Sequence, residues 1–381
     1  MREWEAVIIG GGPAGLGAAI EIASAGGRVL LVDENDTAGG QLFKQIHKFF
    51  GSRAHSAGTR GFVIGQQLLS EIKRLGVEVW LSSAAVGFFS EKTLMVRREI
   101  GEEKFVVNVN AKTILFATGA SENTICFPGW TLPGVMGAGA AQTMINVHRV
   151  LPGKRILMVG SGNVGLIVSY QLMQAGADVL GIVEAANTIS GYGVHAGKIR
   201  RAGVDFILGH SVLKAHGENN RLKTVILAKL DKDWNFIPGS EKEYEVDVLC
   251  LAVGLRPLAE LVCMSGAQHI FVPEMSGWMP LHDENMMTSI PGVYVAGDVS
   301  GVEEANTALD EGRLAGVAIA EQLGLIDSGK AAIMKNDLLM RLRSLRMGPF
   351  GFKRADAKNR VIEYCKSIRD DHESIYIKGR K

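Results

Sequence analysis

The chain opens with a short apolar run, a cluster of glycines and a helical spacing of small apolar residues. Residues 5–9 form the first apolar run, 14–25 the helical segment, and 28–32 a second apolar run that ends at Asp33. Short apolar runs bounded by glycine are typical of buried strands. The order strand, turn, helix, strand predicts a βαβ unit of a parallel sheet.

The same pattern returns about 150 residues later. An apolar run at 155–159 precedes a glycine turn at 160–165, a helical segment at 164–174 and a second run at 178–183 that ends at Glu184. This internal repeat predicts two copies of one nucleotide-binding unit.

The segments between and after the two units are also patterned. A helix is expected at 65–75 and a strand at 77–81, followed by an antiparallel meander over 84–110. A buried strand at 112–117 leads into Ala117, Thr118 and Gly119, and a helix is expected at 305–322.

Further antiparallel segments are expected at 204–208, 222–230 and 244–251. A last strand ends in Gly297 and Asp298, and no strand is indicated beyond about residue 326.

Composition narrows the class of protein. The chain has 381 residues, 47% of them hydrophobic, and a formal net charge of +1, so nothing indicates a nucleic-acid partner. Its four cysteines are scattered, which argues against a disulfide framework, a metal site or a cysteine-ligated cluster. With no signal-peptide pattern and no long apolar span, we expect a cytoplasmic protein without a transmembrane segment.

The first glycine turn, Gly10 to Gly15, lies in the full context of a dinucleotide-binding fingerprint. Gly10 allows the tight turn, Gly12 lets backbone approach a diphosphate, and Gly15 lets helix and strand pack closely. The diphosphate would lie at the helix N-terminus. Asp33, about 20 residues on, would accept hydrogen bonds from ribose hydroxyls.

The second turn, Gly160 to Gly165, predicts the same chemistry with Glu184 as the ribose acceptor. A carboxylate at that point repels a 2′-phosphate, so NAD(H) is favoured over NADP(H). The motif reports phosphate geometry alone. Another adenine nucleotide, or none, therefore remains an alternative for this turn.

Two such units, with Ala117-Thr118-Gly119 between them and a late Gly297-Asp298, resemble the two-dinucleotide-binding-domain flavoproteins over residues 1 to about 325. The resemblance implies FAD on the first turn, Asp298 at the ribityl chain and the helix N-terminus near residue 305 at the flavin. The candidate cofactor-binding residues are Gly10, Gly12, Pro13, Ala14, Gly15, Asp33, Glu34, Gly40, Gln41, Ala117, Thr118, Gly119, Gly297, Asp298, Ala305, Asn306, Thr307, Gly160, Gly162, Asn163, Val164, Gly165 and Glu184.

Disulfide reductases of that family need a redox cysteine pair, and this sequence has none near residue 40 or in the middle of the chain. The segments 119–123 and 127–135 instead resemble α subunits of heteromeric amino-acid dehydrogenases and oxidases, such as those acting on proline, sarcosine, opines and glycine. The resemblance implies that the partner is a second flavoprotein subunit. A [2Fe–2S] group is either supplied by a small separate subunit or absent, because this chain has no cysteine cluster.

We therefore predict an α/β fold of two interleaved Rossmann-like nucleotide-binding domains. The FAD domain would comprise 1–119 and 250–325, the second nucleotide domain 120–249, and a basic tail 326–381. The chemistry would belong to the flavin N5 and not to a side chain. The function is an electron-transferring subunit, a stand-alone NADH-dependent flavin oxidoreductase reducing a soluble carrier or quinone, or a nucleotide-loaded scaffold.

The roles of two basic segments remain open. Residues 44–60 lie near a cofactor phosphate or a partner, or form a solvated loop. The tail, where apolar and basic residues alternate over 340–347, is interpreted as a docking segment, a membrane-binding segment or a poorly ordered terminus.

Overall fold

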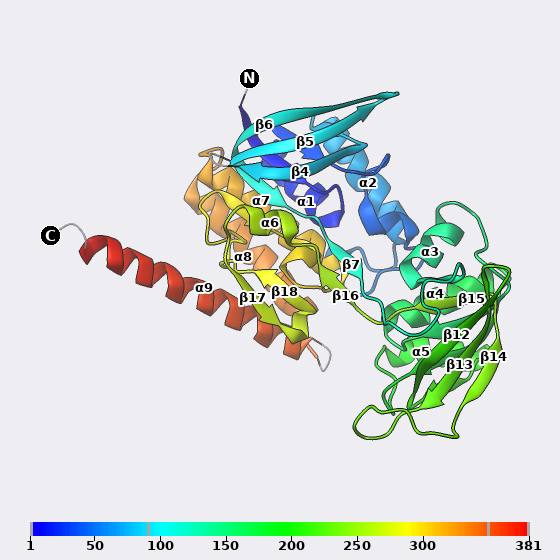
Figure 1. Ribbon diagram of the computed structural model, residues 1–381. Helices are drawn as coiled ribbons and strands as arrows, with labels where there is room; N and C mark the ends of the chain where they lie inside the picture. The colour runs from blue at the N-terminus through cyan, green and yellow to red at the C-terminus, as the bar shows by residue number, and fades with distance from the viewer. Residues whose placement is uncertain (1–2, 90–91, 349–350, 379–381) are drawn as a thin grey trace. The chain divides into compact units, whose positions relative to one another are not determined.

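The computed structural model describes residues 3–89, 92–348 and 351–378, with side chains as far as residue 368, and divides them into two compact units. Unit 1 comprises Met1–Ser121 and Arg256–Lys381, and unit 2 comprises Glu122–Leu255. The chain passes between them through β7 (Ala120–Glu122) and β16 (Leu255–Pro257), which pair with each other (Figure 1).

The centre of unit 1 is a parallel sheet. Strands β3 (Glu78–Trp80), β2 (Val29–Val32), β1 (Trp4–Ile9), β6 (Glu103–Phe116) and β19 (Val293–Val295) lie side by side in that order. Strands β1 and β2 are almost wholly buried, as expected for a parallel sheet covered on both faces.

Strand β6 belongs to two arrangements at once. Its first half pairs antiparallel with β5 (Thr93–Ile100), which pairs with β4 (Ser83–Phe89), whereas its second half pairs parallel with β1. The meander predicted for 84–110 and the strand predicted for 112–117 are therefore one continuous structure.

Two helices of unit 1 pack closely because of their small residues. Helix α1 (Pro13–Ser24) lies against α7 (Ala305–Gln322). A side chain at Gly312 would collide with the carbonyl of Ala14, and one at Gly316 would approach the carbonyl oxygen of Ala18 to 2.7 Å. Helix α2 (Gly61–Arg74) adds an apolar face of Ile64, Leu68 and Ile72 to the same core.

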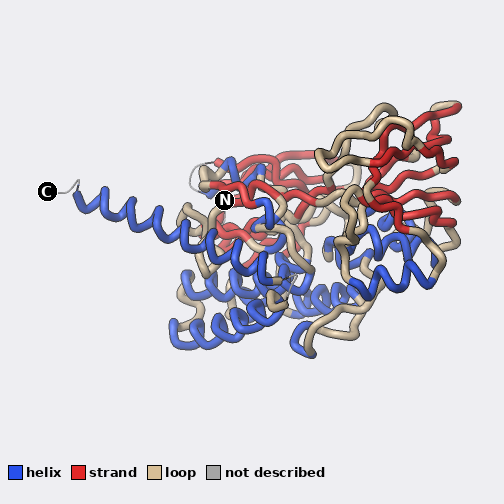
Figure 2. The backbone as a smooth tube through the Cα atoms, turned by 90° about the horizontal axis from the view of Figure 1, so that it is seen from below, coloured by secondary structure: helices blue, strands red, loops and turns tan. Residues whose placement is uncertain are grey.

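Unit 2 repeats the parallel pattern. Its sheet has the order β11 (Phe206–Leu208), β10 (Asp178–Glu184), β9 (Arg155–Val159), β15 (Val248–Leu251) and β8 (Val135–Gly137), all parallel. Helices α3 (Ala138–Asn146), α4 (Asn163–Gln174) and α5 (Gly193–Arg201) pack on it. A separate antiparallel sheet contains β12 (His210–Glu218), β13 (Arg221–Lys229) and β14 (Lys242–Glu245). Figure 2 shows helices and strands in separate layers within each unit.

The antiparallel assignment was wrong for 204–208 and for the end of 244–251. These residues form β11 and β15, which are parallel. All four residues of β15 are buried, because helices cover one face of its sheet and the antiparallel sheet the other. Such a strand has no polar face from which its direction could be inferred.

The basic tail also differs from the expectation of a poorly ordered terminus. Residues beyond 326 form α8 (Ser328–Leu345) and α9 (Phe352–Lys378), and both belong to unit 1. Ala331, Leu338 and Leu342 of α8 join the main core, and Ala357, Val361 and Cys365 of α9 pack on a smaller cluster with Val272 and Met279. Val272 and Met279 belong to the hairpin of β17 (His269–Val272) and β18 (Gly277–Pro280). The short helix α6 (Glu260–Met264) precedes this hairpin in the chain. In Figure 1 the far end of α9 reaches beyond the other elements of its unit.

Candidate functional site

The first glycine turn forms a cradle in front of helix α1. Gly10 has φ of +102°, and a side chain there would collide with the carbonyl oxygen of Ala117. A side chain at Gly15 would collide with the carbonyl oxygen of Gly10. At Gly12, by contrast, a Cβ would meet nothing within 4 Å. Two glycines are thus required by packing, and the middle one leaves open space before the helix N-terminus, where free N–H groups favour an anion.

Asp33 ties this turn to the end of β2. Its buried carboxylate accepts from the Gly11 N–H at 2.6 Å and from the Asn35 N–H at 2.9 Å. Gly40 lies next to the same turn, since a side chain on it would come 2.9 Å from the Gly12 Cα. Asp33 therefore has a structural role in the turn, and the ribose contact expected of it remains a prediction.

The second turn reproduces the first. Gly160 has φ of +105°, and a side chain there would collide with the carbonyl oxygen of Ala252. Gly165 is closed in the same way by the Gly160 carbonyl, whereas a Cβ on Gly162 would meet only the Ser190 hydroxyl, at 3.9 Å. Helix α4 starts at Asn163, directly after the open glycine. Both cradles therefore suit a diphosphate.

The rim of the second cradle is rich in hydroxyl and amide groups. Glu184 Oε2 accepts from the Ser161 N–H at 3.0 Å and from the Ser161 hydroxyl at 2.5 Å, and its Oε1 accepts from the Ala186 N–H at 3.1 Å. The Asn163 side chain accepts from the Tyr192 N–H at 2.9 Å. The repeat thus extends beyond the glycines to the acidic residue that follows each second strand.

One part of the repeat escaped the sequence reasoning. Ala252, Val253 and Gly254 stand to the second turn as Ala117, Thr118 and Gly119 stand to the first, because each alanine carbonyl closes the first glycine of its turn. Gly119 and Gly254 have φ of +76° and +107°. The shared Ala-x-Gly pattern one strand away from each turn is the signal that could have found them.

The remaining candidate residues lie in different environments within their units. The Thr118 hydroxyl donates to the Leu258 carbonyl at 2.7 Å, and the Asn306 amide donates to the Phe50 carbonyl at 2.9 Å. Gly297 and Asp298 begin the 3-10 helix η5 (Gly297–Ser300), and Ala305 begins α7. Pro13, Ala14 and Thr307 lie in the first turns of α1 and α7, whereas Glu34, Gln41 and Val164 are exposed.

Asp298 lies in a strongly perturbed environment. Burial raises the pKa of its carboxyl to about 7, an effect offset in part by the Glu303 N–H and reinforced by the carboxylates of Glu311, Glu303 and Glu304. Near neutral pH such a group both accepts and donates hydrogen bonds, which suits a partner with hydroxyl groups.

The segment 44–60 is anchored to its unit at Phe49 and His55, although most of its residues are exposed. His55 is buried and its Nε2 lies 3.8 Å from Asp310 Oδ2. Arg341 of α8 donates to the Ala54 carbonyl at 2.9 Å and to Asp310 Oδ1 at 2.6 Å. These contacts attach the segment to α7 and α8 of its own unit.

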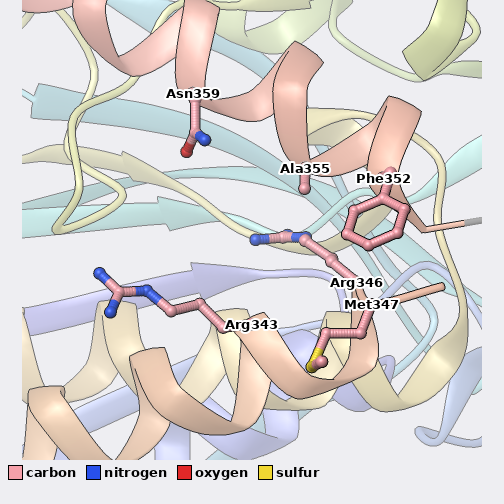
Figure 3. A pocket seen from close by; sticks show the side chains of 6 residues that line it. All are labelled: Arg343, Arg346, Met347, Phe352, Ala355 and Asn359. Atoms are coloured by element: carbon pink, nitrogen blue, oxygen red, sulfur yellow. The ribbon is translucent and has the colours of Figure 1, made fainter.

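A pocket of about 330 Å³ is lined by residues at the end of α8 and by α9: Arg343, Arg346, Met347, Phe352, Ala355 and Asn359 (Figure 3). Arg346 forms ion pairs with residues outside this lining, because its Nη2 lies 2.6 Å from Glu303 and 2.5 Å from Glu311. The pocket contains none of the predicted cofactor residues.

Among the described residues, no helix is long and apolar enough to cross a membrane. No group of three or more histidine, cysteine or acidic residues in that part of the chain could hold a metal ion. No disulfide joins the four cysteines: Cys126 and Cys263 are exposed, and Cys250 and Cys365 are buried.

Residues 4–312 match the pyridine nucleotide-disulphide oxidoreductase family. The chain belongs to this family. Its members are oxidoreductases that bind FAD and NAD(P), and the two cradles provide what two such nucleotides require: a helix N-terminus, open space at the middle glycine and a carboxylate at the neighbouring strand end.

Related proteins narrow the comparison. The chain is 28% identical over 344 residues to one of the subunits of opine oxidase from Agrobacterium tumefaciens, a match that covers 85% of this chain and 67% of that protein. It is also 28% identical over 349 residues to the HcnB subunit of hydrogen cyanide synthase from Pseudomonas protegens, covering 86% and 72%. The structure superposes on L-proline dehydrogenase from P. horikoshii with a TM-score of 0.66 at 24% identity, over 89% of this chain and 59% of that one, which shows the shared fold.

Proposed function

We propose that this oxidoreductase is the electron-transferring subunit of a heteromeric amine or amino-acid dehydrogenase or oxidase, with FAD in the first cradle. The observation that carries the proposal is the combination of two complete nucleotide cradles with four cysteines that are widely separated in the sequence and form no C-x-x-C pair. The relatives named as subunits of opine oxidase and hydrogen cyanide synthase support it.

In the first cradle the chain would bind and orient the flavin nucleotide. Open space at Gly12 and the free N–H groups of α1 would hold the diphosphate, and Asp33 would accept from a ribose hydroxyl. Asp298 would bond the ribityl chain, and the N-terminus of α7 would place a positive dipole near the flavin. Bound FAD supplies the redox chemistry, and the chain sets its position and surroundings.

A disulfide reductase is not proposed, although the family name includes that activity. Such an enzyme needs two cysteines that can form and break a disulfide. Cys250 is buried, and burial raises the pKa of its thiol to about 12, so it does not supply a thiolate. Burial also raises the pKa of the Cys263 thiol. No disulfide joins any two of the four cysteines.

The proposed partner is a second flavoprotein that oxidises the C–N bond and passes electrons to this chain. The small [2Fe–2S] subunit, where one exists, would be a separate chain, since four scattered cysteines do not form a cluster site here. The proposal includes no nucleic-acid partner, in keeping with the net charge of +1.

A second candidate is a stand-alone NADH-dependent flavin oxidoreductase. Glu184 favours it, because a carboxylate at the end of β10 accepts from a free ribose 2′-hydroxyl and repels a 2′-phosphate. NAD(H), or another adenine nucleotide, would then occupy the second cradle.

The two candidates separate in one anaerobic experiment. The purified chain is mixed with an amino acid alone, with the amino acid plus the flavoprotein encoded beside it, and with NADH, while flavin absorbance is followed. Bleaching that requires the second flavoprotein supports the proposed role in electron transfer. Amino-acid oxidation by the lone chain at the rate of the pair contradicts it, and rapid bleaching by NADH alone favours the second candidate.

A further inference from the structure

A buried carboxylate lies directly behind the turn that begins with Gly297. Glu311 of α7 is 2% exposed and accepts from the Gly297 N–H at 3.1 Å and from the Ser300 hydroxyl at 3.0 Å. It also pairs with Arg346 at 2.5 Å and with Lys358 at 2.8 Å. Burial alone would raise the pKa of Glu311, but the two cations outweigh it and hold the pKa at about 2.

Lys358 reaches this turn from α9. Its side chain is 2% exposed, and its ammonium donates to the Ser300 carbonyl at 2.7 Å and to the Ser300 hydroxyl at 3.0 Å. The third neighbour is the ring of His282, whose Nε2 lies 3.4 Å away and whose Nδ1 donates to the Asp283 carbonyl. Burial lowers the pKa of His282 to about 3, so the ring is neutral and its Nε2 accepts from the lysine.

Arg346, directly after the last residue of α8, pairs with the two carboxylates Glu303 and Glu311. Its guanidinium forms a forked pair with Glu303, through Nη2 at 2.6 Å and Nε at 3.0 Å. The backbone N–H of Glu303 in turn donates to Asp298 Oδ1 at 3.3 Å. A planar guanidinium that forms hydrogen bonds to two carboxylates restricts their positions more than a single point charge does.

The C-terminal part of the chain therefore provides the two cations, Arg346 and Lys358, that pair with Glu303 and Glu311 beside Asp298. Arg354 of α9 lies farther from its partner Glu304, at 3.9 Å. Lys358 is among the largest fully buried side chains of the described residues. A fully buried lysine is rare unless it is paired, so its placement marks a specific use.

We propose that Arg346 and Lys358 are positioning residues for FAD, acting through Glu303, Glu311 and Ser300 on the Gly297–Asp298 turn. The C-terminal helices thereby become part of the flavin site, although neither cation is expected to touch the cofactor. This inference rests on FAD occupying the first cradle.

The test compares Lys358→Met with Lys353→Met, a matched control on the same helix with an exposed lysine. The dissociation constant of FAD, the visible circular dichroism of the bound flavin and its midpoint potential are measured for both. We expect Lys358→Met to weaken FAD binding by about tenfold or more, the scale seen when partners that orient ligating groups are removed, and to change the flavin spectrum. Lys353→Met should match the unaltered chain.

Ser300→Ala is the second variant, because it removes one hydroxyl from the network and leaves both buried ion pairs in place. We expect it to shift the flavin spectrum and potential while the protein remains folded, so that the test does not depend on the stability of Lys358→Met. FAD affinity, spectrum and potential equal to those of the unaltered chain in both variants would overturn the inference. An unaltered chain that binds no FAD would overturn the proposed cofactor as well, which distinguishes the two failures.

Discussion

At the first cradle the residue after the opening glycine is another glycine, Gly11, and at the second cradle it is Ser161. A side chain on Gly11 would come 2.8 Å from the Asp33 carboxylate and 2.9 Å from the Ala38 Cβ. In the second cradle the acidic residue is the longer Glu184, and the Ser161 hydroxyl donates to it. Each cradle thus pairs the length of its acidic residue with the size of its second turn residue.

The two cradles also differ in what surrounds them within their own units. Next to the first cradle lies the Gly297–Asp298 turn, since a Cβ on Gly297 would come 3.0 Å from the Ala14 Cβ. Behind this turn, Glu311 of α7 forms ion pairs with Arg346 and Lys358. The second has a rim of serine, asparagine and backbone N–H groups. The same glycine pattern therefore provides a diphosphate position in both cradles, whereas the residues around each cradle differ and would make different contacts with its nucleotide.

The largest expected effect comes from filling the open space at each middle glycine. Gly12→Val should abolish flavin retention, and Gly162→Val should leave the flavin in place but abolish any reaction with NADH, because only the ligand space is filled. Flavin absorbance per chain after gel filtration, with a melting curve for each variant, checks this. Loss of flavin in both variants would contradict the assignment of separate cofactors.

The first glycine of each turn should affect stability and not binding alone. Gly160→Ala places a Cβ against the Ala252 carbonyl with φ of +105°, so we expect a cost of roughly 2 kcal/mol or more. Gly162→Ala is the matched control and should change the free energy of unfolding by less than about 0.5 kcal/mol. Denaturant titration of both variants measures their free energies of unfolding. Equal values would contradict the structural role of the first glycine.

The pairing of acid length with turn residue can be tested by exchange. Gly11→Ser should cost about 1–3 kcal/mol through overpacking against Asp33 and Ala38. Adding Asp33→Glu moves the carboxylate and should recover part of that loss, with a coupling energy of at least about 0.5 kcal/mol in a double-mutant cycle. Strict additivity of the two changes would mean that the sequence difference between the cradles is incidental.

Glu184 should set the choice of nucleotide at the second cradle. Glu184→Gln keeps the acceptor oxygen but removes the negative charge, so the preference for NADH over NADPH should narrow by about tenfold, or ~1.4 kcal/mol. Binding constants for both nucleotides, measured by titration calorimetry, check this. A preference that does not change would remove the electrostatic argument.

The last expected effect is a pH dependence of stability that comes from Asp298. Its pKa of about 7 in the fold exceeds the usual 3.8, so the folded chain holds this proton more tightly than the unfolded chain does. The stabilisation is complete below about pH 4 and is lost as the pH rises through about 7. The melting temperature of the flavin-free protein should fall by a few °C more over this interval than that of Asp298→Asn. Parallel curves for the two proteins would contradict the sign of the shift.

The repeated βαβ units, the two glycine turns and the acidic residues at the ends of β2 and β10 could be predicted because each is a local pattern. The direction of β15 could not, since a strand buried on both faces carries no alternation, and β11 is a three-residue edge strand too short to show one. The pairing of Gly11 with Asp33 was missed as well, because it depends on a distance between residues 22 positions apart.

The basic tail shows most clearly which contacts could not be predicted from the sequence. Arg341, Arg346 and Lys358 resemble solvated charges in the sequence, yet their partners Asp310, Glu303 and Glu311 lie 31 to 47 residues earlier on another helix or just before it. Only the fold places these charges together, and no periodicity within the tail encodes it. Ala252 and Gly254, by contrast, could have been found by extending the internal repeat one strand further.

The measurement that tests the central claim most directly is the absorbance spectrum and flavin content of the purified chain beside Gly12→Val and Gly162→Val. The account predicts a yellow protein with one FAD per chain, a colourless but folded Gly12→Val, and a Gly162→Val that keeps its flavin. A folded Gly12→Val that still carries FAD would contradict the assignment of the first cradle as the flavin site.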